Sequence, residues 1–125
     1  SLVFLAGCGQ STTTVTIDQT VFDVMIADEP AEQELGLGDT PSLRKNQGML
    51  FVFDSSAPRT FWMKGVEYQI YIIWINDNVV MGTVTAYPGS ILYDSPQPVD
   101  TVLEIQAGTA ATEQIEVGDN VMIDK

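Results

Sequence analysis

The sequence contains no histidine and a single cysteine, Cys8. Without histidine, Ser-His and Cys-His catalytic pairs and histidine metal ligands are excluded. One cysteine can form neither an intrachain disulfide nor a cysteine zinc cluster. Positive charge is also scarce, because 5 basic residues face 17 acidic ones and the formal net charge is −12. Such a surface repels phosphates, so we expect no nucleic-acid partner.

The remaining composition is that of a globular protein. The chain has 125 residues, of which 45% are hydrophobic, which suits one domain with a buried core. The acidic surplus serves solubility or attracts cations or a basic partner. Past the first residues, no segment is long and apolar enough to span a bilayer. We expect no cofactor and no metal site.

The first residues resemble a bacterial lipobox. An apolar run ends in Leu5-Ala6-Gly7-Cys8, and polar Ser and Thr residues follow it. In a lipobox, small residues expose the bond before the cysteine to a peptidase, and the thiol carries the lipid. We therefore predict lipid attachment at Cys8, a membrane partner through this N-terminus, and an extracytoplasmic location in the cell envelope. The alternative is an apolar N-terminal strand that contains a cysteine by chance.

The missing basic start of such a signal leads us to interpret residues 1–14 as a truncated signal peptide, lipobox and Ser/Thr tether. Residues 15–125 are then a single β-rich domain. Its hydrophobic residues recur mostly with the two-residue period of strands. The predicted strands start at Val15 and Phe22 and then cover residues 49–53, 59–64, 70–75, 79–81, 102–105, 115–117 and 121–123.

Turns and one short helix separate these strands. Residues 54–58 and 76–78 have turn composition, and the second turn predicts a hairpin over residues 70–86. A short helix is expected between Asp28 and Leu37, with Asp28 as its cap and Pro30 in its first turn. We predict an all-β (mainly β) fold, a small β-sandwich or barrel of jelly-roll-like type with one short helix.

Several motifs resemble a bacterial and archaeal family, the domain of unknown function numbered 192. They are, in order, residues 33–37, 48–53, 61–64, 72–76, 102–108 and the turn Gly118-Asp119. The resemblance implies a compact β-rich domain with a short helix, often preceded by a lipobox. It implies no reaction. The chain departs from the family by having Ile70-Tyr71 where an Asp is usual, and Gly65-Val66 where Asn-Thr is frequent.

The best candidate ligand-binding residues are Arg59, Trp62, Lys64 and Glu67. In a strand, Trp62 and Lys64 would share a face and place a ring beside a cation. Lys64 could then attract a carboxylate or phosphate of a small ligand. The alternative is core packing by Trp62 with Lys64 paired to a nearby acid. Acidic residues 28, 29, 32 and 34 suit helix capping better than calcium binding.

No catalytic residue stands out, so enzymatic activity stays uncertain. The leading hypothesis is a non-enzymatic binding or accessory module of the bacterial envelope, acting on an unknown small ligand or envelope protein. A carboxylate-based hydrolase of an envelope polymer is the first alternative. A purely structural protein-interaction domain is the second. A pocket around Trp62 and Lys64 would favour a small ligand, whereas two close carboxylates in a deep cleft would favour an enzyme.

Overall fold

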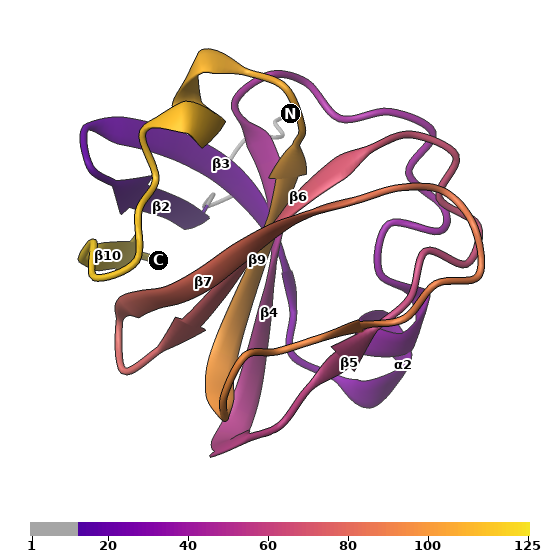
Figure 1. Cartoon of the computed structure of the whole chain (residues 1–125), viewed down its shortest axis with the longest axis horizontal. Coiled ribbons are helices and arrows are strands. Elements are labelled where there is room, and N and C mark those ends of the chain that lie inside the picture. Colours follow the sequence, from indigo (N-terminus) through magenta and orange to yellow (C-terminus); the bar gives the residue numbers. More distant parts are fainter. Residues whose placement is uncertain (1–12) are drawn as a thin grey trace, which may run out of the picture.

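The computed structural model describes residues 13–125 and is built around one strongly curled sheet (Figure 1). The order of its seven strands is β10-β2-β3-β4-β9-β6-β7. These strands are β2 (Thr13–Ile17), β3 (Thr20–Ala27), β4 (Gln47–Ala57), β6 (Ile70–Asn76), β7 (Val79–Ala86), β9 (Val99–Gln106) and β10 (Val121–Asp124). A second, two-stranded sheet pairs β5 (Thr60–Phe61) with β8 (Tyr93–Asp94).

The two edges of the main sheet approach each other. Val79, at the start of β7, forms an antiparallel bridge with Asn120, just before β10. The neighbouring Val80 donates a hydrogen bond to the carbonyl of Asp119 over 2.9 Å and accepts one from Gly118 over 2.8 Å. The sheet therefore curls into a half-barrel, and the predicted mainly β fold with one short α-helix is confirmed.

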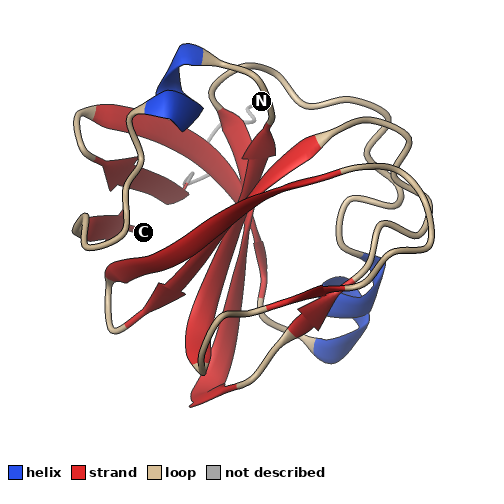
Figure 2. Cartoon of the chain, viewed as in Figure 1, coloured by secondary structure: helices blue, strands red, loops and turns tan. Residues whose placement is uncertain are grey.

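The sheet is covered on both faces. One face packs cluster A, which includes Met49, Phe51, Ile72, Trp74 and Val102 and lies under α2 (Pro30–Leu35). The other face packs cluster B, drawn mainly from β2, β3, β6, β9 and β10. Figure 2 shows the 3-10 helix η1 (Ala110–Glu113) and α2 on opposite sides of the molecule. Strands such as β6 and β9 are therefore apolar on both faces.

The predicted hairpin is confirmed, as β6 pairs antiparallel with β7. Asp77 and Asn78 adopt the left-handed conformation, with φ of 51° and 61°. Two consecutive residues with positive φ form the type of turn that matches the twist of a two-residue hairpin. The alternation expected after Phe22 is also confirmed, because Phe22 and Val24 are buried in cluster B.

The short helix forms, but its N-cap differs from the prediction. Glu29, rather than Asp28, is the cap residue, and Pro30 opens the helix. The carboxylate of Glu32 accepts hydrogen bonds from the backbone N–H groups of both Asp28 and Glu29, over 3.2 and 3.1 Å. The helix ends at Gly36, whose φ of 53° favours glycine. The capping box thus accounts for the side chains of Glu29 and Glu32.

Three parts of the secondary-structure prediction were wrong. Residues 54–57 are not a turn but the end of β4, because Ala57 pairs with Val99 of β9 beyond a register shift. The strand predicted over residues 59–64 shrinks to Thr60–Phe61, since its partner β8 is only two residues long. Residues 115–117 form no strand and follow η1 instead.

The N-terminal boundary also differs. β2 starts at Thr13, and Thr13 and Thr14 pair with Val24 and Asp23. These two threonines therefore belong to the sheet rather than to the tether expected over residues 1–14. No helix within residues 13–125 is long and apolar enough to cross a membrane.

Candidate functional site

A pocket of about 480 Å³ opens beside the cluster A face, between α2 and the segment that follows β4. Its volume lies within the range of small-molecule sites. The lining side chains come from α2 and the turn after it, from the cluster A face of the sheet, and from the segment around β5. They are residues 33–37, Phe51, Phe53, residues 58–62, Lys64, Val66 and Glu104.

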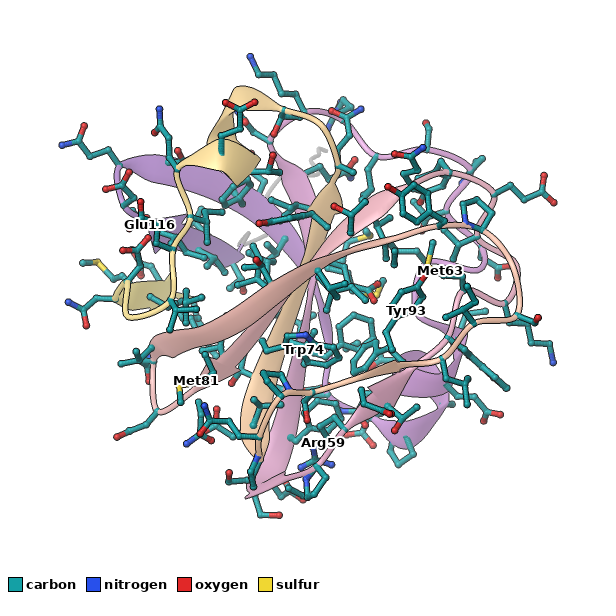
Figure 3. All side chains as sticks on the ribbon, in the orientation of Figure 1. Arg59, Met63, Trp74, Met81, Tyr93 and Glu116 are labelled. Carbon is teal, nitrogen blue, oxygen red and sulfur yellow. The ribbon has the colours of Figure 1, made fainter. Side chains whose placement is uncertain are left out.

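Arg59 holds the segment of β5 against the main sheet. Its Nε donates a hydrogen bond to the carbonyl of Val99 over 3.3 Å, and its guanidinium also donates to the carbonyl of Ser55. The same group lies 3.9 Å from the centre of the Phe53 ring. Figure 3 shows Arg59 close to the lower end of the sheet, below Trp74. Arg59 thus lines the pocket while its guanidinium is already engaged.

Aromatic rings form the wall of the pocket that faces the core. Phe61 contacts Phe51 edge-on, with ring centres 4.8 Å apart, and Trp74 in the same manner at 5.6 Å. Edge-to-face ring pairs of this kind stabilise the folded protein by more than the burial of their apolar area alone. Because Phe51 and Trp74 are fully buried in the main sheet, they fix the position of Phe61 and of the segment that carries it.

Trp62 and Lys64 lie at the exposed side of the pocket. Trp62 is 45% exposed, an unusual state for so large an apolar side chain. The ammonium group of Lys64 lies 5.3 Å from the centre of its indole ring. The sequence predicted that these two side chains lie beside each other. It placed them in a strand, however, and neither residue belongs to one. The chain has 5 basic residues, and two of them, Arg59 and Lys64, line this one pocket.

Glu67, the fourth candidate residue, lies elsewhere. It lines a separate shallow depression with Asp39, Thr40 and Tyr68. Gly65, whose φ is 79°, lies between Lys64, which lines the first pocket, and Glu67, which does not. The structure therefore brings three of the four candidate residues together and leaves Glu67 apart from them.

Glu104 is the pocket residue that sequence reasoning did not single out. Only 3% of this side chain is exposed, although it is ionisable. Burial raises the pKa of Glu104 to about 8. A carboxyl group with such a pKa is largely protonated at neutral pH, and strongly perturbed groups beside a pocket are typical of functional sites.

The other sites considered from the sequence have these outcomes. Cys8 lies outside the described residues. Within residues 13–125, no three acidic or cysteine side chains converge as metal ligands would. Of residues 76–78, Asn76 is the last residue of β6, and residues 77 and 78 form the hairpin turn to β7.

Two solved structures share this fold. A Sinorhizobium meliloti protein described as a candidate transcription regulator matches with a TM-score of 0.82 and 25% identity, over 90% of this chain and 93% of that one. A Novosphingobium aromaticivorans protein of unknown function matches with a TM-score of 0.79 and 31% identity, over 89% of this chain and 83% of the other. No curated protein matches the sequence.

The family model of domain of unknown function 192, described as an uncharacterised ACR family, matches residues 13–123. This span includes the strands of the half-barrel, except for the last residue of β10, and the whole pocket. The chain therefore belongs to the domain-of-unknown-function family 192.

Proposed function

We propose that this chain is a binding module of the bacterial envelope that holds a small ligand in the pocket between α2 and β5. The observation that carries the proposal is a pocket of about 480 Å³ in which an exposed tryptophan, a lysine and a buried carboxyl group converge. Binding sites typically combine aromatic walls with a few polar groups that fix the orientation of the ligand.

The distribution of charge supports the same pocket. The formal net charge is −12, yet Arg59 and Lys64 both lie here. Acidic residues Glu34 and Glu104 line it as well, so the pocket offers both signs of charge. A protein partner would instead be favoured by a broad exposed apolar patch.

Ligand binding is tested by thermal unfolding of the Cys8→Ser chain, which cannot be lipidated, in the presence of sugars, nucleotides, amines and organic acids. A ligand at a hundred times its Kd adds about 2.7 kcal/mol to the free energy of unfolding, which raises Tm by several degrees. We expect Lys64→Ala to change that shift, reducing it for an anionic ligand and increasing it for a cationic one.

Lys45→Ala is the matched control, because Lys45 is exposed, carries the same charge and lies outside the pocket. An equal change of the shift in both variants would point to a general charge effect and contradict binding beside Lys64. A panel without any shift would contradict the ligand proposal and favour a protein partner.

The second part of the proposal is attachment to a membrane through a lipid on Cys8. Its support is the lipobox Leu5-Ala6-Gly7-Cys8 and the polar stretch after it. Expression of the full gene with labelled palmitate should label the wild type, and Cys8→Ser should remain unlabelled and soluble. An unlabelled, soluble wild type would contradict both lipidation and the envelope location.

A carboxylate-based hydrolase is the second candidate function. It is favoured by one observation, namely that Glu34 and Glu104 line the same pocket and that the pKa of Glu104 is raised. General acids in glycoside hydrolysis have this property. Hydrolysis of an envelope glycan by the wild type and its loss in Glu104→Gln would support this function. Equal hydrolysis by both proteins would exclude Glu104 as the acid.

A further inference from the structure

Glu104 places a carboxyl group in the middle of an otherwise apolar face. In register, it pairs with Met49 of β4 on one side and with Ile72 of β6 on the other. Both neighbours belong to cluster A. Because Glu104 lines the pocket, the small part of it that remains exposed opens toward the pocket.

The described residues supply no partner for this carboxyl group. Burial raises its pKa, and Arg59 and Lys64, the positive charges that line the same pocket, do not offset this effect. Tyr68, whose pKa is raised by burial and by the charge of Glu104, donates its hydroxyl hydrogen to the carbonyl of Thr40 over 2.8 Å. A buried carboxylate without a counter-ion is strongly disfavoured. A positively charged ligand would supply the counter-ion that the described residues do not provide for Glu104.

The aromatic rings of this pocket already accept cations. The guanidinium of Arg59 lies over Phe53, and the ammonium of Lys64 lies near the ring of Trp62. Aromatic faces attract ammonium groups through their quadrupole, and more strongly in a desolvated site. Phe61, which stands between Phe51 and Trp74, adds an apolar surface for the body of a ligand.

We propose that the pocket binds a primary ammonium ion with an apolar body, its ammonium group paired with the carboxylate of Glu104. This inference rests on the proposed ligand-binding function and names the class of ligand. The net charge of −12 supports it, because a negative surface raises the local concentration of cations. The other charged or titratable groups near this carboxyl are Glu34, Arg59, Lys64 and Tyr68.

Three probes with one phenyl body test the charge of the head group. They are 2-phenylethylamine, 2-phenylethanol and phenylacetate, titrated into the Cys8→Ser chain and followed by NMR. We expect the amine to bind about tenfold or more tightly than the alcohol. Glu104→Gln should reduce the affinity for the amine to that for the alcohol. Glu113→Gln, an exposed acid on η1, is the control and should leave the affinity unchanged.

The possible results separate this inference from the function on which it rests. Tighter binding of phenylacetate or 2-phenylethanol, or an amine affinity that Glu104→Gln does not change, would overturn the amine proposal while leaving a ligand pocket. The same holds if none of the probes binds but other molecules shift Tm. Failure of every molecule tested would overturn both.

Proton release gives a readout that needs no variant. At pH 7 the carboxyl of Glu104 is mostly protonated in the empty pocket, since burial raises its pKa to about 8. Pairing with an ammonium ion favours the carboxylate, so binding should release nearly one proton per ligand at pH 7. Calorimetry in buffers of different ionisation enthalpy measures this number. A value of zero would overturn the pairing.

Discussion

The ammonium group of Lys64 lies 5.3 Å from the centre of the Trp62 ring, and both side chains line the pocket between α2 and β5. The two residues follow β5 in an irregular segment whose position is fixed by Phe61 and Arg59. Their contact is therefore a product of the tertiary structure, and it forms the exposed rim of the site.

A double-mutant cycle should detect this contact. Exposed cation–π pairs contribute about 0.5–1 kcal/mol, so Lys64→Met and Trp62→Leu should be coupled by roughly that amount. Urea denaturation of the four proteins measures the coupling. The cycle of Lys45→Met with Trp62→Leu should give none. A coupling near zero in the first cycle would mean that the two side chains do not meet in solution.

Arg59 should contribute to stability rather than mainly to ligand binding. Its guanidinium bonds two backbone carbonyls and covers the Phe53 ring. Arg59→Ala is expected to lower the free energy of unfolding by about 1–3 kcal/mol. Lysine cannot reproduce two diverging N–H donors, so Arg59→Lys should recover little.

Arg44→Ala is the control for this change, because Arg44 is exposed and outside the pocket. We expect it to alter the free energy of unfolding by less than about 0.5 kcal/mol. Thermal and urea unfolding of the three variants measure these differences. If Arg59→Ala left the free energy of unfolding unchanged, this would contradict the structural role of Arg59 and favour a role in ligand binding.

Sequence periodicity predicted the strands whose neighbours are close in the chain. The β6–β7 hairpin follows from the turn residues Asp77 and Asn78, which tolerate positive φ. It also found part of β9, which pairs only with distant strands, but it failed at strand ends whose extent depends on a distant partner. The end of β4 is extended because Ala57 pairs with Val99, and residues 62–64 are not because β8 is too short to pair with them. Pairing between strands far apart in the chain cannot be predicted from the residues of one strand alone.

The pocket was only partly predictable for a related reason. Trp62 and Lys64 attract notice as an aromatic ring beside a rare positive charge, and both line the pocket. Glu104 looks ordinary, because an acid between Leu103 and Ile105 suits a strand with one solvent-facing side. Burial of both faces of β9 makes it unusual. The signal available in the sequence was an apolar run in β9 interrupted by one acid.

Any side chain at Gly48 should destabilise the pairing of β4 with β9. A Cβ atom added to Gly48 would lie 2.7 Å from the carbonyl oxygen of Glu104, and 3.0 Å from the Cγ2 of Ile105. The backbone of a central strand cannot move away without losing its pairing. Gly48→Ala should therefore lower the free energy of unfolding by about 1–3 kcal/mol, as overpacking does.

Gly89→Ala is a control that tests backbone strain without contact, because nothing lies within 4 Å of its added Cβ although its φ is 140°. Gly48→Ala should also shift the NMR resonances around Glu104, whereas Gly89→Ala should leave them in place. A stable Gly48→Ala with an unchanged spectrum would contradict the close approach of these two strands.

Glu104 should make the protein less stable as the pH rises. The pKa of its carboxyl is about 8 in the folded protein and near the ordinary value of 4.5 in the unfolded chain. Between these values the folded state binds more protons than the unfolded state, so the free energy of unfolding falls with increasing pH. The full effect is on the order of 4–5 kcal/mol, reached near pH 8.

Glutamine cannot ionise, so the wild type should lose stability relative to Glu104→Gln between pH 5 and 8, and the difference should level off above that range. Urea denaturation at each pH measures it, and the other carboxyl groups cancel because both proteins carry them. Glu113→Gln, with its side chain exposed, should follow the wild type. Parallel curves for the wild type and Glu104→Gln would show that the carboxyl is solvated or paired, and would remove the main support for an ammonium ligand.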